Sequence, residues 1–128
     1  MEESCTKKLT VGRENLASSV GSGSLDVLAT PAVAALMEGA AAQLAQNILD
    51  NPALTTVGTK LCVEHTSPSP LGAEVEAEAR LVKTDGRFFE FELFARDNAG
   101  EIARGTHTRV SVKAEKFQQK ADCKYEQI

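Results

Sequence analysis

A run of 20 residues from Thr30 to Leu49, TPAVAALMEGAAAQLAQNIL, contains a single charged side chain, that of Glu38. Its alanine, leucine and methionine residues favour a helix, Pro31 suits the first helical turn, and the sequence DNP at 50–52 ends it. Because the run is apolar nearly all round, we expect other elements to cover most of its surface. The run therefore predicts one long, largely buried helix with a carboxylate at its middle.

Four strand-like runs follow the helix, over residues 56–67, 73–84, 88–96 and 101–114. The second run alternates with a period of two, and the sequence DGR at 85–87 predicts a tight hairpin turn after it. Its apolar face carries Val75, Ala77, Ala79 and Leu81, and its polar face carries Glu74, Glu76, Glu78 and Arg80. A short strand around 9–11 and a Gly/Ser-rich loop precede the helix. The order predicts an α+β fold, in which an antiparallel sheet wraps around one central helix.

The 128 residues suit one domain, which we place over 1–128 with its core at about 8–118 and a polar C-terminal tail, helical or disordered. The net charge of −4, without a Lys/Arg cluster, argues against nucleic-acid binding. No stretch has the ~20 apolar residues of a membrane span. Three widely spaced cysteines form no metal-binding motif, so we expect a reduced, cytoplasmic setting with no metal or cofactor.

Glu38 has two interpretations. It lies at a helix edge, where it meets solvent or pairs with Arg104 or Arg109, or it is a carboxylate held in an apolar cleft. Desolvation in such a cleft strengthens a carboxylate as a base, whereas pairing with an arginine opposes this effect. The second interpretation makes Glu38 a candidate catalytic residue.

Other polar residues are candidates for the same site. Thr30 is either the N-cap of the helix or a hydroxyl at its positive end, and from helix geometry alone the N-cap is favoured. His65 ends a strand and is a structural residue or a proton-transfer partner of Glu38. Cys62 is not a candidate nucleophile paired with His65, since residues three apart face opposite sides of a strand. His107 is interpreted as a solvent or interface position.

Several motifs together resemble the hotdog-fold thioesterases, in particular the fluoroacetyl-CoA thioesterase-like group. The resemblance covers about residues 8–118, and the motifs keep their order. They are LMEGAAAQLA, GTKLCVEHTSPSPLGAEVEAEARL, GRFFEFELFARD and EIARGTHTRVSVKAEKF. The resemblance implies hydrolysis of acyl-CoA thioesters at the interface of a homodimer that pairs edge to edge, with a tetramer left open.

Matched residue by residue, the family's catalytic threonine, glutamate and histidine fall on Thr30, Glu38 and His65. A glycine whose backbone faces the thioester carbonyl falls on Gly58, and a CoA-contacting arginine falls on Arg109. The resemblance thus implies that Glu38 is buried for catalysis, and it leaves Thr30, Glu38 and water open as the attacking group.

One departure concerns the segment before the helix. The fluoroacetyl-specific enzyme has an aromatic lid residue there, whereas this chain has VGSGSLDVLAT without Phe, Tyr or Trp. We therefore expect small acyl-CoA substrates without a strong preference for fluorine. Two alternatives remain: a hotdog hydratase, whose usual Asp-and-His loop signature is absent here, and a non-catalytic acyl-CoA binding module.

Overall fold

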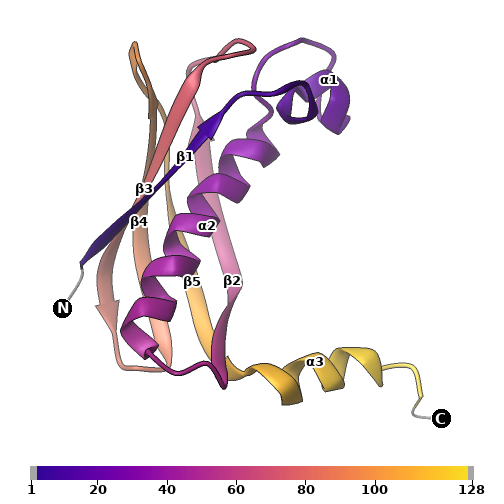
Figure 1. Cartoon of the computed structure of the whole chain (residues 1–128), viewed down its shortest axis with the longest axis vertical. Coiled ribbons are helices and arrows are strands. Elements are labelled where there is room, and N and C mark those ends of the chain that lie inside the picture. The colour runs from indigo at the N-terminus through magenta and orange to yellow at the C-terminus, as the bar shows by residue number, and fades with distance from the viewer. Residues whose placement is uncertain (1–2, 127–128) are drawn as a thin grey trace.

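The computed structural model describes residues 3–126, which form a five-stranded antiparallel sheet with one long helix packed against it (Figure 1). The sheet has the strand order β1-β3-β4-β5-β2, so β1 and β2 are its edges. In chain order the elements are β1 (Ser4–Thr10), the 3-10 turn η1 (Arg13–Asn15), α1 (Ala17–Val20), α2 (Thr30–Leu49), β2 (Leu54–His65), β3 (Glu74–Thr84), β4 (Phe88–Asp97), β5 (Gly100–Lys113) and α3 (Ala114–Asp122).

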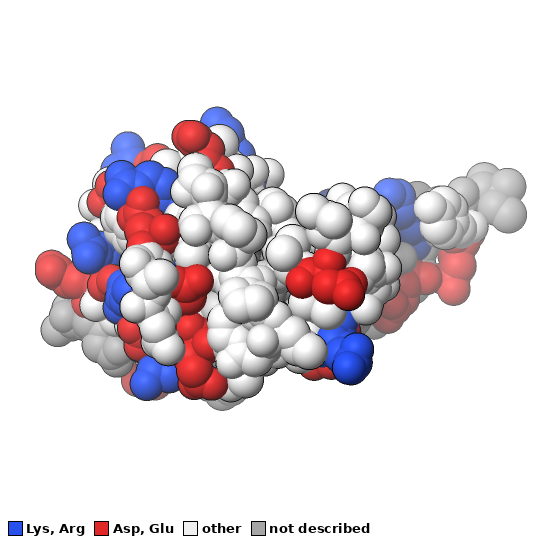
Figure 2. Space-filling view, turned by 90° about the horizontal axis from the view of Figure 1, so that it is seen from above, with Lys and Arg blue, Asp and Glu red and all other residues white. Residues whose placement is uncertain are grey.

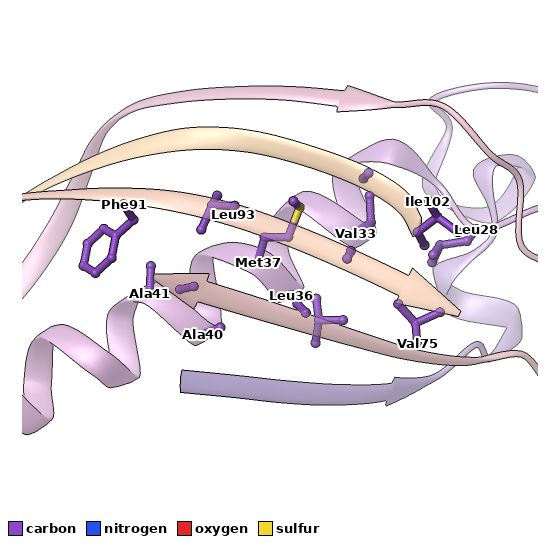
Figure 3. Close-up of a cluster of buried hydrophobic side chains, with 14 of the residues drawn as sticks. Leu28, Val33, Leu36, Met37, Ala40, Ala41, Val75, Phe91, Leu93 and Ile102 are labelled. Atoms are coloured by element: carbon purple, nitrogen blue, oxygen red, sulfur yellow. The ribbon is translucent and has the colours of Figure 1, made fainter. Parts of the chain in front are cut away.

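The predicted helix is α2, and its bounds are those of the apolar run. Its buried side chains, many of them alanines, pack against the apolar face of the sheet (Figure 3). The helix ends at Asp50, which adopts a left-handed backbone conformation and donates its N–H to the Gln46 carbonyl. Other elements cover less of α2 than expected, because three side chains on its remaining face are exposed, those of Ala35, Gln43 and Asn47. One face of α2 is thus uncovered in the single chain.

The period-two pattern places the sheet residues as predicted. Val75, Ala77 and Ala79 of β3 are at most 2 % exposed, and Phe89 and Phe91 of β4 are at most 1 % exposed. These side chains form one core cluster with those of α2. The alternation of polar and apolar residues therefore fixes which face of the sheet meets the helix.

Some predicted bounds need correction. The first strand spans Ser4–Thr10, because its backbone pairs along β3, and not 9–11. β2 begins at Leu54 and ends at His65, after which the N–H groups of Thr66 and Ser67 both donate to the Ile102 carbonyl and the chain turns away. The polar tail forms the helix α3. Residues 1, 2, 127 and 128 of the predicted domain lie outside the described residues.

The arrangement brings two distant segments together at one end of the molecule. α2 and β2 run in opposite directions, so the N-terminus of α2 lies beside the end of β2 (Figure 1). The other end carries the start of β2, the end of β5 and the projecting helix α3. No helix in the described part of the chain is long and apolar enough to cross a membrane.

Candidate active site

Thr30 and His65 form a hydrogen-bonded pair where α2 begins and β2 ends. Thr30 Oγ1 lies 2.8 Å from His65 Nδ1. The interpretation of Thr30 as an N-cap is wrong: Thr30 is inside the helix, and the N-cap position is Ala29, which makes no side-chain capping bond. The threonine hydroxyl is hydrogen-bonded to the imidazole and is thus placed for proton transfer.

Burial sets the protonation of His65. Desolvation lowers the pKa of His65, and a backbone hydrogen bond with Ser67 opposes this only in part. Nε2 is buried, and in the residues 3–126 it meets no atom with good hydrogen-bond geometry. A lowered pKa keeps the ring neutral at pH 7, so one of its nitrogens is an acceptor. When Nδ1 is that acceptor, Thr30 donates its hydroxyl proton toward His65.

A cleft of about 310 Å³ adjoins this pair. Its lining contains no Lys, Arg, Asp or Glu and no Phe, Tyr or Trp; it consists of Ala17, Ser22, Val27, Leu28, Ala29, Thr30, His65, Thr66, Ser67 and Pro68. Figure 2, which views this end of the molecule, shows a band of uncharged atoms across its centre, with charged side chains densest on the left and further acidic and basic ones on the right-hand lobe. The cleft is small and uncharged, and Thr30 and His65 supply its reactive groups.

Glu38 belongs to a second polar group, farther along α2. Its Oε2 atom lies 3.9 Å from Arg109 Nη1 and 3.7 Å from His107 Nε2. The expected pairing with Arg109 is thus a loose contact, and Arg104 instead binds Glu101. The expectation of a buried carboxylate is not met in the single chain, where the Glu38 side chain is 39 % exposed. Glu38 therefore faces both a cation and open space.

Hydrogen bonds hold the Arg109 side chain in place beside Glu38. Its Nε donates to the Thr56 hydroxyl and its Nη2 to the Thr56 carbonyl, both at 2.8 Å, and its Nη1 lies 3.1 Å from His107 Nε2. Arg109 is 8 % exposed, and burial lowers its pKa while Glu38 raises it. With most of its donors engaged inside the protein, the guanidinium presents one edge to Glu38.

His107 completes this group as a neutral ring. Its Nδ1 lies 2.7 Å from the Lys60 carbonyl, which can only accept, so Nδ1 carries the proton and Nε2 accepts from Arg109. Burial lowers the pKa of His107, with the Arg109 charge acting in the same direction. The interpretation of His107 as a solvent or interface position is wrong, since it is 2 % exposed.

Gly58 lies opposite Arg109 in the β2–β5 register, next to a β-bulge. A Cβ atom at this position would lie 3.0 Å from both Glu38 Oε2 and His107 Cε1, and 3.4 Å from Arg109 Nη1. Few residues larger than glycine fit without displacing these groups. Gly58 thus leaves room for a ligand atom or a carboxylate to approach the β2 backbone.

The structure brings the predicted residues together in two groups. Thr30 joins His65, and Glu38 joins Gly58 and Arg109; within residues 3–126, no hydrogen bond or ion pair links the groups. Sequence reasoning missed Thr56 and undervalued His107, although the alternation along β5 placed His107 on the face of Arg109. Within that same range, no group of three or more His, Cys, Asp or Glu is placed to hold a metal ion.

Comparisons with known proteins agree with one another. The family described as "FlK: Fluoroacetyl-CoA-specific thioesterase" matches residues 11–115. A fluoroacetyl-CoA thioesterase from Streptantibioticus cattleyicolor is 36 % identical over 95 residues, which cover 74 % of this chain and 68 % of the relative.

Solved structures extend the likeness. A threonine-to-serine variant of the fluoroacetyl-CoA enzyme FlK in complex with acetyl-CoA is 28 % identical, with a TM-score of 0.88 over 98 % of this chain and 99 % of that chain. A hot-dog-like protein from Thermanaerovibrio acidaminovorans has 18 % identity and a TM-score of 0.83 over 95 % of this chain and 90 % of its own. The predicted hotdog fold is confirmed.

Proposed function

Because the chain belongs to the fluoroacetyl-CoA-specific thioesterase family and is a thioesterase that acts on acyl-CoA, we propose that Thr30, Glu38 and His65 carry out the hydrolysis. The observation that supports this most is the hydrogen bond of 2.8 Å between Thr30 and His65 at the uncharged cleft. A thioesterase needs a group that delivers an oxygen nucleophile to the carbonyl carbon, and a neutral imidazole bonded to a hydroxyl supplies one.

In the proposed mechanism, His65 accepts a proton through Nδ1 as the nucleophile forms its bond to the carbonyl carbon. The nucleophile is the Thr30 hydroxyl or a water molecule that takes the same position. The C–S bond then breaks, the sulfur leaves and takes a proton from the imidazolium, and CoA departs as the free thiol. If Thr30 attacks, water hydrolyses the resulting ester in a second, equivalent cycle, and the acid is released.

Glu38 acts at the other side of the reacting carbon. Its carboxylate orients the attacking water, whose proton passes to His65, and the positive charge of Arg109, 3.9 Å away, supports its position. Gly58 lets the thioester approach the backbone of β2, whose N–H groups stabilise a developing oxyanion. Arg109 is thus proposed to contact the CoA part of the substrate near the thioester.

We also propose a homodimer that completes the site. β2 is an edge strand of 12 residues, and an unprotected edge of this length favours pairing with another strand. The exposed face of α2 and the half-exposed Glu38 lie on the uncovered side of the chain. Pairing of two β2 edges would bury these groups and give Glu38 the apolar surroundings that the single chain lacks.

The chain is proposed to act as one domain in a reducing, cytoplasmic compartment. A single core cluster runs from Val11 to Ala103 and supports the assignment of one domain. Cys62 and Cys123 are exposed free thiols, which persist in a reducing environment.

The proposed substrates are CoA thioesters of short or small branched acids. The cleft lining contains no aromatic lid, so no side chain there is placed to select fluorine over hydrogen. A panel of acyl-CoA substrates that includes acetyl-CoA and fluoroacetyl-CoA tests this by release of free thiol. We expect steady turnover of small acyl groups at similar kcat/KM. Tight binding without thiol release would support a binding module, and a preference for fluoroacetyl-CoA by orders of magnitude would refute the argument from the lid.

A further inference from the structure

An acyl-CoA substrate carries a diphosphate and a 3′-phosphate, and the two polar groups of the site do not account for them. The lining of the cleft at Thr30 and His65 contains no cation. Arg109 is 8 % exposed and donates to Thr56 and His107. Because phosphates of a bound ligand are usually met by cations, a basic surface should lie within reach of the thioester position.

A cavity of about 420 Å³ where β5 passes into α3 provides such a surface. We call it the basic cavity; its cations are Arg87, Lys113, Lys116 and Lys120, and its lining includes Ser111 and Phe117 but no carboxylate. Ser111 donates its N–H to the Arg87 carbonyl, which fixes the β3–β4 turn against β5. Four cations around one cavity are unexpected in a chain with a net charge of −4.

No close ion pair holds the cations of the basic cavity in the described residues. Arg87 instead lies over the Phe88 ring at 5.8 Å. Three carboxylates lie nearby along the chain. Asp85 caps its own turn and its charge interacts with that of Arg87, and Asp122 accepts a hydrogen bond from Gln118. Glu115 lines a neighbouring cavity that shares Lys113 and Lys116 with the basic cavity. Phe117 is 43 % exposed and offers a ring for a base to stack on.

The spacing along the sheet fits the length of CoA. Gly58 pairs with Arg109, and Leu54, which lines the basic cavity, pairs with Lys113. Four residues separate these register positions on each strand, or ~13 Å of extended chain. The pantetheine arm has 12 bonds between its sulfur and its terminal oxygen, as many as four residues of backbone, and so spans ~14 Å when extended. A thioester at Gly58 therefore places the phosphates near the basic cavity.

We propose that the basic cavity binds the phosphates of coenzyme A, with Lys113, Lys116 and Lys120 as their partners and Phe117 against the adenine. This inference rests on the proposed function for the identity of the ligand. It assigns α3 a role in binding that the thioester chemistry does not require, so the two are separable by experiment.

The test compares a full substrate with one that lacks phosphates, namely acetyl-CoA and the acetyl thioester of N-acetylcysteamine. The variant is Lys116→Gln/Lys120→Gln, and the matched control Lys8→Gln/Lys83→Gln removes the same charge from β1 and β3. We expect KM for acetyl-CoA to rise about tenfold in the first variant only, because each exposed charge contact contributes up to ~1 kcal/mol. The kcat and the KM for the truncated thioester should stay at wild-type values.

Two outcomes overturn the proposal. KM for acetyl-CoA could equal that of the control variant, or KM could rise equally for both substrates, which would assign the lysines a structural role. If the wild type hydrolyses neither substrate, the proposed function fails, and calorimetric titration with CoA and with pantetheine still decides this inference. Weaker CoA binding by Lys116→Gln/Lys120→Gln, with pantetheine binding unchanged, supports the basic cavity, and equal CoA binding refutes it.

Discussion

The substitution Arg109→Met removes the donor that organises the polar group beside Glu38 while keeping the apolar stem of the side chain. It leaves three buried acceptors without their partner: the hydroxyl and the carbonyl of Thr56, and Nε2 of His107. Each unsatisfied acceptor destabilises the folded state by ~1 kcal/mol or more. Removing the buried charge opposes this in part, because the folded state no longer has to desolvate a guanidinium. We expect a net loss of about 2–3 kcal/mol in the free energy of unfolding.

Urea denaturation of Arg109→Met and of Arg104→Met measures this loss. Arg104 lies on the same strand, but its side chain is 61 % exposed and binds Glu101 at the surface, so its loss should cost less than ~1 kcal/mol. Equal slopes of the two unfolding transitions show that the comparison is one of stability. If the two variants lose the same free energy, Arg109 does not hold a buried network and the proposed support of Glu38 is wrong.

Further predictions concern the pH dependence of stability, the room at Gly58 and the oligomeric state. Burial lowers the pKa of His65 and His107 below the ordinary value of 6.5, so the unfolded chain binds protons more readily than the folded one. The free energy of unfolding should therefore be full above pH 6.5 and decline below it. When Tm is measured against pH, its decline should be less steep in His65→Gln. A pH-independent Tm would contradict the buried, neutral rings. Gly58→Ala should lower kcat/KM by about tenfold or more, because the new methyl group displaces Glu38 and His107, and an unchanged rate would exclude close approach there. Sedimentation at micromolar concentration should show a dimer, and a fully active monomer would refute a shared site.

The elements that sequence patterns define best are those with one dominant period. The apolar run, the position of Pro31 and the sequence DNP place this helix close to its observed bounds, and only Thr30 differs, since it lies inside the helix and not at the N-cap. The alternation in β3 likewise predicts the buried face, since Val75, Ala77 and Ala79 all lie on it and are buried. β1 has a weaker alternation, and its pairing with β3 extends it to Ser4.

The partners within the site could not be read from local patterns. The bond between Thr30 and His65 joins residues 35 positions apart, and it exists because α2 and β2 run antiparallel at matching heights. From helix geometry alone, capping was the better interpretation of the same hydroxyl. His107 shows the same limit: alternation put it on the face of Arg109, but its burial depends on the close approach of the Lys60 carbonyl from β2.

The kcat of the Glu38→Gln variant with a small acyl-CoA decides whether Glu38 takes part in hydrolysis. Glutamine keeps the size and hydrogen-bonding capacity of Glu38 but removes its charge and its basicity. If Glu38 acts in hydrolysis, kcat falls by roughly 10² to 10⁴ while Tm stays near that of the wild type. A folded Glu38→Gln variant within a few-fold of the wild-type kcat would contradict the account and would favour an acyl-CoA binding protein.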